Sequence, residues 1–269
     1  MQVIQGSNNI DVMLKMYDIV RRAPESGPRG LKTRDVANLA VILDTRICPL
    51  TSFNARKLNL DYAKKEWLWY IKADPMDDSI VEHAKAWQKL KQPDGSFASN
   101  YGQYIFGPSF DESQFKYVIK TLIGDRDSRR ASMMFLNRDH LYEGNVDTVC
   151  TYAINFRIID GYLNMTVMMR SNDVIFGFTN DAFCFWNLYH FVYAMLADKM
   201  DGLKMGSYTH LVNSMHVYER HFDMISDIVR EASPGYIRQA VPVPTSEDVK
   251  HLLKGDHDFS SPYITWLTS

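Results

Sequence analysis

Residues 170 to 181 read Arg170-Ser171-Asn172-Asp173-Val174-Ile175-Phe176-Gly177-Phe178-Thr179-Asn180-Asp181, an arginine and two aspartates around a short apolar run. Cys150 lies twenty residues before this segment, and Met215-His216-Val217-Tyr218-Glu219-Arg220-His221 follows it. A nucleophilic cysteine needs positive charge nearby to lower the pKa of its thiol, and Arg170, expected on the next strand, supplies it. Taken alone, a free cysteine is more often a small buried hydrophobe.

The chain around this segment has the pattern of strands and one long helix. Residues 150–167 are expected to form a hairpin, because the pair Asp160-Gly161 in their middle is typical of a two-residue β-turn. Residues 182–200 predict a long apolar helix. Elsewhere the pattern predicts helices at 10–22, 60–71, 80–90, 115–122 and 221–233, strands at 36–43, 131–136 and 208–217, and an irregular tail from about 241. A single α+β domain spanning residues 1–269 is the economical interpretation.

The composition is that of a globular protein with a full core. Of 269 residues, 46% are hydrophobic and 23% are charged, and the net charge of −2 provides no basic field for DNA or RNA. Cys48, Cys150 and Cys184 are too few and too scattered for a disulfide framework or a zinc site, and the histidines lack metal-ligand spacing. No signal-peptide pattern occurs, and no apolar run approaches the roughly 20 residues of a membrane helix.

A cysteine followed by R-S-x-D-V-x-x-G and then by H-x-Y-x-x-H resembles the thymidylate synthase family. The resemblance implies a thiolate, Cys150, that attacks C6 of a pyrimidine nucleotide so that C5 accepts a one-carbon unit from 5,10-methylenetetrahydrofolate. It also implies a large mixed sheet that packs back to back in a homodimer. The match is dense over 128–130 and 150–221, whereas the tail after 241 does not match the family's C-terminus, which closes over the folate.

Asp181 stands where thymidylate synthases carry the asparagine that reads uracil. Cytosine offers an unprotonated N3 and an amine, and a carboxyl group accepts from that amine and, with a proton, addresses N3. This exchange resembles the deoxycytidylate hydroxymethylases of the family, with Asp181 both reading the base and taking part in catalysis. The alternative is a helix N-cap before residues 182–200, a role that Asn180 fills equally well.

Two further side chains carry predicted catalytic roles. Glu66 matches the family glutamate that organises water and relays protons, and burial would raise the pKa of its carboxyl toward neutrality. The alternative for Glu66 is an exposed helix position beside Lys64 and Lys65. Tyr101 matches a family tyrosine near C5, and a core tyrosine in a turn is an almost equal alternative.

Arginines are the natural clamp for a phosphate dianion, because the guanidinium fork binds two oxygens at once. Arg29, Arg129, Arg130 and Arg170 correspond to the family's phosphate arginines. The loop around Arg29 departs from the family pattern, so Lys32 or Arg46 is an alternative there. In the family the paired arginines reach the phosphate of the neighbouring subunit, which implies a homodimer with arginines that cross between subunits.

The remaining site residues follow from the same resemblance. His216 and Tyr218 alternate on a strand and would hold the sugar hydroxyl, while Ser171 would contact the phosphate and Asn155 the base. On the folate side, Asp173 would bond the pterin, Trp87 would flank the methylene, and Gly177 would allow close approach of the ring. For Trp87, a packing aromatic is the alternative.

Taken together, the sequence predicts a folate-dependent enzyme that hydroxymethylates dCMP at C5. Three alternatives stay open: a dCMP methyltransferase, a CMP hydroxymethylase, and a nucleotide-binding protein without turnover. Enzymes of the predicted kind are typically phage proteins that prepare modified DNA precursors, so the resemblance implies the host cytoplasm as location, without nucleic acid, membrane or metal as partner.

Overall fold

A large mixed sheet forms the centre of the fold. The computed structural model describes residues 1–141, 144–231, 241–256 and 260–269. Within them the sheet has eight strands: β1 Gln2–Ile4, β2 Glu25–Ser26, β3 Thr33–Asp44, β4 Ser132–Met134, β5 Thr151–Ile159, β6 Tyr162–Met169, β7 Asn172–Asp173 and β8 Lys204–Tyr218. Along the main path the order is β1-β3-β8-β6-β5-β4, with β2 paired to β3 and β7 paired to β8. The predicted mixed sheet is therefore confirmed.

The sheet contains both parallel and antiparallel strand pairs. The β6 strand runs antiparallel to β5 and parallel to β8, and β3 is antiparallel to β8. The hairpin between β5 and β6 turns at Asp160 and Gly161, which have φ angles of 51° and 82°, as the predicted two-residue turn requires. Buried and partly exposed side chains alternate along β6, so one face of the strand packs inward and the other faces outward.

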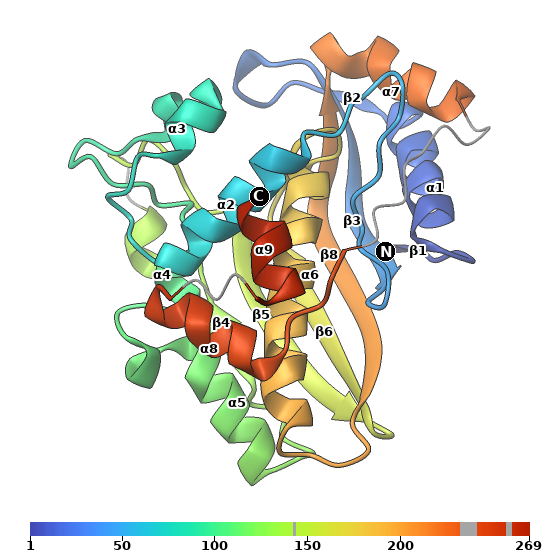
Figure 1. Cartoon of the computed structure of the whole chain (residues 1–269). Helices are drawn as coiled ribbons and strands as arrows, with labels where there is room; N and C mark the ends of the chain where they lie inside the picture. Colours follow the sequence, from blue (N-terminus) through green and yellow to red (C-terminus); the bar gives the residue numbers. More distant parts are fainter. Residues whose placement is uncertain (142–143, 232–240, 257–259) are drawn as a thin grey trace.

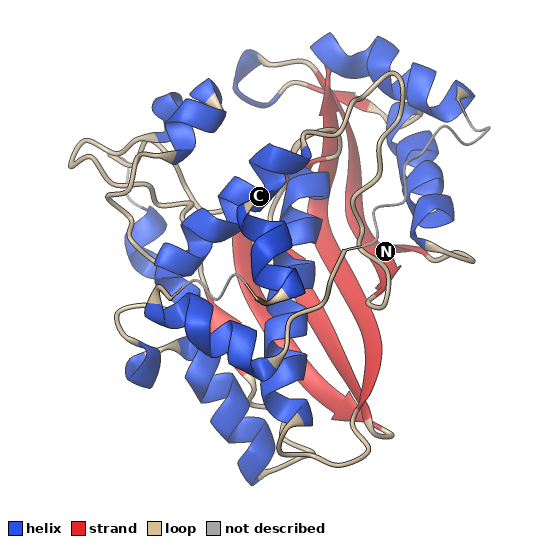
Figure 2. Ribbon diagram, viewed as in Figure 1, coloured by secondary structure: helices blue, strands red, loops and turns tan. Residues whose placement is uncertain are grey.

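Helices cover the inward face (Figures 1 and 2). They are α1 Asn9–Arg21, α2 Leu60–Lys72, α3 Ile80–His83, α4 Gly102–Ile105, α5 Gln114–Gly124, α6 Gly177–Ala197, α7 Phe222–Arg230, α8 Ser246–Lys254 and α9 Pro262–Thr268. The central one is α6, which is apolar all round and buried along most of its length, as expected for a helix between a sheet and other helices. It packs against α2, α5, α8, β6 and β8.

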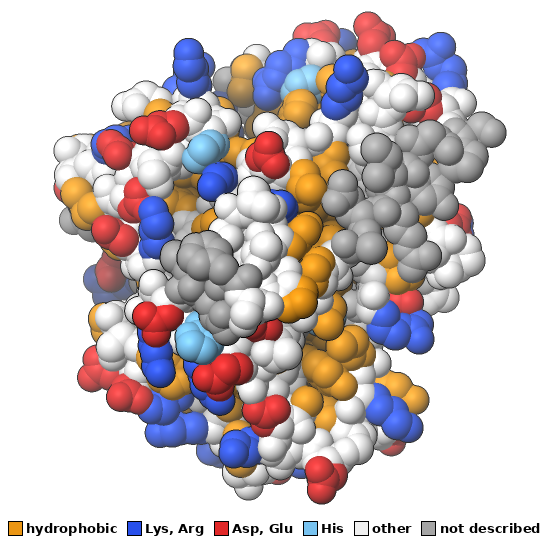
Figure 3. Space-filling view, viewed as in Figure 1, with side chains coloured by type: hydrophobic (Ala, Val, Ile, Leu, Met, Phe, Trp, Pro, Cys, Tyr) orange, Lys and Arg blue, Asp and Glu red, His pale blue; other side chains and the backbone are white. Residues whose placement is uncertain are grey.

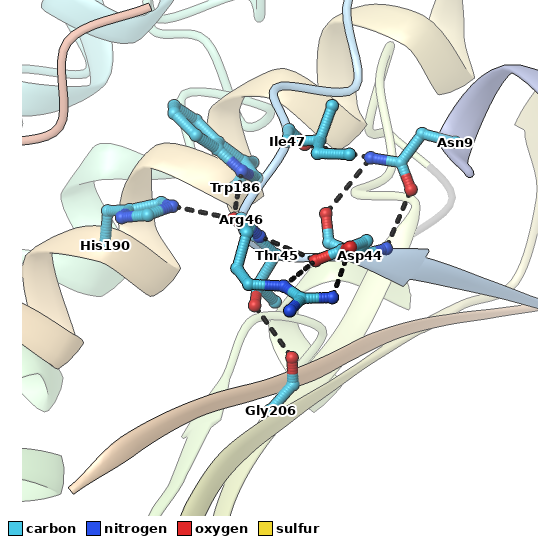
Figure 4. Close-up of polar contacts among 8 residues, drawn as sticks. All are labelled: Asn9, Asp44, Thr45, Arg46, Ile47, Trp186, His190 and Gly206. Atoms are coloured by element: carbon cyan, nitrogen blue, oxygen red, sulfur yellow. Dashed lines mark hydrogen bonds and ion pairs between the residues drawn. The ribbon is translucent and has the colours of Figure 1, made fainter. Parts of the chain in front are cut away.

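Hydrogen bonds to the turn after β3 hold α6 in register with the sheet (Figure 4). The indole of Trp186 and the imidazole of His190 both donate to the carbonyl oxygen of Thr45, at 2.7 and 2.9 Å. The Thr45 hydroxyl donates to the carbonyl of Gly206 on β8, at 2.7 Å. Arg46 pairs with Asp44 in the same turn. The rotation of α6, and with it the direction of its N-terminal side chains, is thereby fixed.

Three predicted elements differ from the structure. Residues 80–90 form the short α3 and a 3₁₀ helix, Lys85–Leu90, because Ala84 between them is extended, with φ of −149°. The predicted helix at 182–200 begins five residues earlier, at Gly177. The predicted helix at 221–233 is observed as α7, which begins at Phe222 and ends at Arg230; the turn signal Pro234-Gly235, which the sequence suggests as its stop, lies outside the described residues.

The prediction of an irregular tail from residue 241 is wrong, because α8 and α9 lie there. Thr245 and Asp248 form a capping box at the start of α8, and Gly255 ends it in the left-handed conformation. In α9, the Tyr263 hydroxyl donates to the side chain of Asn187 on α6 at 2.7 Å and accepts from the Trp67 indole at 3.2 Å. These signals were present in the sequence, but Pro242 and Pro244 before α8 and Pro262 at the start of α9 favoured an irregular interpretation.

The surface facing the viewer in Figure 3 carries basic and acidic side chains side by side, with no field of one sign. In the described part of the chain, no helix combines the length and the apolar character needed to cross a bilayer.

Candidate active site

A cavity of about 1170 Å³ opens where the N-terminal end of α6, the strand end of β6, β8 and α2 meet. Most of the side chains that the sequence singles out line it: Arg29, Glu66, Trp87, Tyr101, Cys150, Arg170, Ser171, Asp173, Gly177, Asp181, His216 and Tyr218. These residues come from segments up to 189 positions apart in the chain, as Arg29 and Tyr218 show. The volume exceeds that of an ordinary small-molecule pocket, so there is room for two ligands.

Cys150 lies half-buried immediately before β5. The guanidinium of Arg170 donates to the carbonyls of Thr148 and Val149, at 2.5 and 3.0 Å, and so ties the segment before the thiol to the end of β6. A β-bulge at Tyr152 follows directly, a feature often found beside active sites. Burial raises the pKa of the Cys150 thiol to about 11, and the positive charge of Arg170 offsets this only in part. The predicted influence of Arg170 has the expected direction, but desolvation outweighs it.

Glu66 is buried in α2, with 4% of its surface exposed. The Tyr70 hydroxyl, one helical turn further on, donates to its Oε1 at 3.4 Å, while Oε2 has no partner among the described residues. Burial raises the pKa of Glu66 to about 8, the negative charge of Asp181 raises it further, and hydrogen bonds from Tyr62 and Tyr70 lower it. Glu66 therefore lies inside the fold, which excludes the exposed helix position as an alternative.

We expect Glu66→Gln to make stability less dependent on pH. A carboxyl whose pKa is higher in the folded chain stabilises the fold below its unfolded pKa, and this contribution is lost as the pH rises to the folded pKa. For Glu66 the window runs from 4.5 to about 8. Within this pH window, the unfolding free energy of the wild type should fall relative to that of the variant by up to about 1.4 kcal/mol per pH unit. Urea unfolding at several pH values measures this.

The exposed Glu112 offers a matched control, since Glu112→Gln makes the same chemical change at the surface. The difference in unfolding free energy between the wild type and Glu66→Gln is the quantity to follow. If it stays constant between pH 5 and 8, the Glu66 carboxyl titrates as in water.

Asp181 lies in the second turn of α6, because the helix starts at Gly177 with Phe176 in the capping position. Neither Asp181 nor Asn180 is at the N-cap, so the capping role that competed with base reading does not apply. The side-chain amide of Asn172 donates to Asp181 Oδ2 at 3.2 Å. Burial raises the pKa of Asp181 to about 7, the Asn172 bond lowers it and the negative charge of Asp173 raises it. Near neutral pH this carboxyl is thus available in both protonation states.

Two of the arginines that were predicted to bind a phosphate, Arg29 and Arg170, line the cavity and carry positive charge there. Arg29 lies in the 3₁₀ turn Pro28–Gly30 with φ of 54°, and Arg170 directly follows β6; the positive charges of both lower the pKa of the Cys150 thiol. The two alternatives for Arg29 are engaged elsewhere: Lys32 pairs with Glu25 and Glu219, and Arg46 with Asp44 (Figure 4). Sequence reasoning missed Arg56, a cavity residue that is only 4% exposed and donates to the carbonyl of Ile175 at 2.5 Å.

Three predicted substrate contacts lie outside the cavity. Arg129 and Arg130 are exposed between α5 and β4, and neither forms an ion pair in the described part of the chain. Asn155 lies on β5, where its amide donates to Ser132 Oγ at 2.8 Å and to the carbonyl of Ala131 at 3.3 Å. The geometry gives no support to a contact between Asn155 and a base in this cavity.

The predicted sugar and phosphate contacts form a small group on one wall. His216 and Tyr218 are two positions apart on β8 and both line the cavity, with perpendicular rings whose centroids are 5.0 Å apart. The Ser171 hydroxyl lies 3.4 Å from His216 Nδ1. An imidazole, a phenol and a hydroxyl thus converge, as recognition of a polar ligand requires.

Aromatic side chains also line the cavity, among them Tyr62 and Trp87. Trp87 donates its indole N–H to the Tyr62 hydroxyl at 2.8 Å and packs edge-on against Trp69 at 5.0 Å. The Asp173 carboxylate accepts from the backbone N–H groups of Ile175 and Phe176, at 3.1 and 3.4 Å, and so is held at the cavity wall. These groups suit a flat, hydrogen-bonding ring system.

Tyr101 is both a core residue and a cavity residue, so the two predicted alternatives hold together. It is 4% exposed, stacks on Phe185 at 5.9 Å and contacts Tyr70 and Phe135, as a core residue does. It also lines the cavity, and burial raises the pKa of its phenol well above the ordinary value. Its hydroxyl therefore remains a neutral donor and acceptor.

Sequence reasoning missed the partners of the two key carboxyl groups. Tyr62 and Tyr70 flank Glu66 at spacings of four residues, so their position on its face of α2 was detectable from helical periodicity. Asn172 occupies the variable position of the R-S-x-D pattern, and nothing in the local sequence connects it with Asp181. Among the described residues, no cluster of metal-binding side chains occurs.

The family described as Thymidylate synthase matches residues 15–245 of this chain. "Deoxycytidylate 5-hydroxymethyltransferase" of Enterobacteria phage T4 is 32% identical over 206 residues, which cover 73% of this chain and 80% of the phage protein. "Thymidylate synthase" of Bacillus atrophaeus is 29% identical over 177 residues, which cover 62% and 74% of the two chains. Among solved structures, thermostable thymidylate synthase A from Bacillus subtilis superposes with a TM-score of 0.66 at 22% identity, covering 81% and 84%.

Proposed function

The chain belongs to the thymidylate synthase family of one-carbon transferases, and on this premise we propose that it is a deoxycytidylate 5-hydroxymethyltransferase. The observation that carries the proposal is Asp181, a carboxyl at the cavity wall with a pKa raised to about 7. Protonated, it donates to the unprotonated N3 of cytosine, and its second oxygen accepts from the exocyclic amine. The similarity to the deoxycytidylate 5-hydroxymethyltransferase of phage T4 supports the same assignment.

In the proposed reaction, the sulfur of Cys150 bonds to C6 of dCMP. A proton from Asp181 on N3 lets the ring accept this electron pair without building negative charge on the base. C5 becomes nucleophilic and would bond to the methylene carbon of the donor. As C5 then gives up its proton, the bond between that carbon and the donor nitrogen would break, which leaves an exocyclic methylene on C5. Water then adds to the exocyclic carbon while the bond from C6 to Cys150 breaks, which releases 5-hydroxymethyl-dCMP. The buried Glu66 is placed to relay the protons of these steps.

Three cavity residues fit 5,10-methylenetetrahydrofolate as carbon donor. Asp173 would bond the pterin, and Trp87 and Gly177 would border the ring. When bound, this group supplies a carbon at the oxidation level of formaldehyde. Unlike the family, whose C-terminus closes over the folate, this chain packs α9 against α6, so Tyr263 is engaged in the core rather than at the cavity.

Three other functions remain alternatives to the proposed one. A dCMP methyltransferase would use the same residues and deliver hydride in place of water. A CMP hydroxymethylase would differ only around the 2′ position. A binding protein without turnover is disfavoured because Cys150 and Glu66 are intact and share one cavity.

Release of tritium from [5-³H]dCMP in the presence of the folate tests whether the protein turns over, and mass analysis of the product separates the alternatives. We expect tritium release with dCMP and a product heavier by one hydroxymethyl group. A methyl product would assign the methyltransferase, and binding of dCMP without tritium release would reject an enzyme.

We further propose that the protein acts as a homodimer in which Arg129 and Arg130 reach the phosphate bound by the other subunit. Both arginines are exposed and outside the cavity of their own chain, as such a role requires. The outward face of the sheet supports the arrangement, since apolar Met168 on β6 and Leu211 on β8 lie on it only partly buried.

Arg129→Ala and Arg130→Ala should each weaken binding of dCMP far more than binding of deoxycytidine. Each substitution deletes a charge-assisted hydrogen bond to phosphate, worth about 1.5–3 kcal/mol, which corresponds to roughly tenfold or more in affinity. Calorimetric titration with the nucleotide and with the nucleoside measures the difference.

Mixing Arg129→Ala with an inactive Cys150→Ser variant gives the matched test of the dimer. One of the two sites in a hybrid dimer would contain both native residues if the arginine crosses between subunits, so partial activity should return. Equal losses for nucleotide and nucleoside would show that these arginines do not bind the phosphate.

A further inference from the structure

A chain of four polar side chains runs from the cavity wall into the core behind Asp181. Asn172 Nδ2 lies 3.2 Å from Asp181 Oδ2 and 3.1 Å from Nε2 of His210. The Nδ1 atom of the same imidazole lies 2.6 Å from the hydroxyl of Tyr208. Asn172 is 4% exposed, and His210 and Tyr208 are fully buried. The Asp181 carboxyl is therefore attached to a polar network inside the fold.

Three elements far apart in the sequence hold this network together. Asn172 belongs to β7, which pairs with β8, the strand that carries Tyr208 and His210, and Asp181 belongs to α6. A side chain at Gly177 would place its Cβ 2.6 Å from Asn172 Oδ1, so the glycine lets the first turn of α6 rest directly on the amide. The Asn172 side chain is thus confined between the helix and the strand.

The rear of the network does not change charge near neutral pH. Burial lowers the pKa of His210 to about 3 and raises that of the Tyr208 phenol well above its ordinary value, so the imidazole and the phenol both remain neutral. The neutral imidazole has one donor and one acceptor, which the hydroxyl and the amide engage. Rotating the Asn172 amide within this buried network would leave polar groups unpaired, which favours a single orientation of the amide.

We propose that Asn172 is a positioning residue, whose amide, braced by His210 and Tyr208, fixes the orientation of the Asp181 carboxyl and thereby the preference for cytosine over uracil. This inference rests on the proposed function, because it presumes that Asp181 reads the base. It adds that the carboxyl alone does not suffice: without the amide behind it, Asp181 loses the orientation that cytosine requires.

Other ionisable groups face Asp181 and influence it electrostatically. They are Asp173 on β7, Glu66 and Tyr70 on α2, Cys150 before β5, Tyr101 before α4, Cys184 on α6 and Tyr208 on β8. All of them are unchanged in a variant of Asn172. A shift in pH dependence that appears on substitution of Asn172 therefore reports on its own bond to Asp181.

Asn172→Leu removes the amide at nearly constant shape. The ratio of kcat/KM for dCMP to that for dUMP, from C5 tritium release, should fall about tenfold to a hundredfold, as expected for a lost hydrogen bond to a charged group. In an Asp181→Asn background the same substitution should change the ratio by less than about twofold, because the effect passes through the carboxyl. The alkaline limb of dCMP turnover should also move to higher pH, since the amide bond favours the ionised carboxyl.

Asn187 provides the matched control. It is a fully buried asparagine of α6 whose side chain bonds Phe183 and Tyr263 and does not line the cavity. Asn187→Leu should lower thermal stability and leave the substrate ratio and the pH profile unchanged. If Asn172→Leu does not fold, His210→Leu removes the brace and should lower the ratio in the same direction.

The outcomes separate the two proposals. A folded Asn172→Leu protein that keeps the wild-type ratio of kcat/KM for dCMP to that for dUMP, and the wild-type pH profile, would overturn the positioning role. The proposed function would still stand in that case, provided that the wild type turns over dCMP. A wild type that turns over dUMP and not dCMP would overturn the proposed function itself, and the inference with it.

Discussion

Replacing Cys150 by serine should abolish product formation while dCMP still binds. A hydroxyl is a far weaker nucleophile than a thiolate at neutral pH, and removal of an essential nucleophile lowers turnover by roughly 10⁴-fold or more. The contacts expected from Arg170, Ser171 and His216 remain in the variant, so affinity for the nucleotide should change little. Tritium release from C5 measures the chemistry, and calorimetric titration with dCMP measures the binding.

Cys48 provides the control for this substitution. It is a free cysteine outside the cavity, so Cys48→Ser should retain turnover. Product formation by Cys150→Ser at a rate near that of the wild type would remove Cys150 from the mechanism.

Asp181→Asn should shift the substrate preference from dCMP toward dUMP. The asparagine amide presents a donor to O4 of uracil and an acceptor to its N3-H, whereas against cytosine one of these contacts meets the wrong partner. A mismatched buried polar pair costs on the order of 1–3 kcal/mol, or roughly tenfold to a hundredfold in relative rate. Tritium release from each labelled nucleotide at equal concentration gives the ratio.

The position of Asp181 in the second turn of α6 sharpens the interpretation of that result. Because it is not the helix cap, a changed ratio would not be explained by loss of capping. A wild type that already prefers dUMP, or a variant that keeps the wild-type ratio, would show that this carboxyl does not select the base.

The sequence by itself determined the parts of this protein that depend on local patterns. Apolar spacing predicted α1 and α2 within one residue at each end. The pair Asp160-Gly161 predicted the turn of the β5–β6 hairpin, because an aspartate followed by glycine accepts the positive φ angles that such a turn needs. The resemblance to the thymidylate synthase family also selected Cys150, Glu66 and Asp181, and these three side chains line one cavity in the structure.

Other features were decided only when the chain folded. The start of α6 at Gly177 depends on packing of its first turn against Asn172, a contact that no periodicity encodes. The exclusion of Asn155 from the cavity depends on its pairing with Ser132 across two strands. The network behind Asp181 joins β7, β8 and α6 across 38 positions from Asn172 to His210. Hydrogen bonds between distant segments form only at the register that core packing selects, so the tertiary structure alone decided how the Asp181 carboxyl is held.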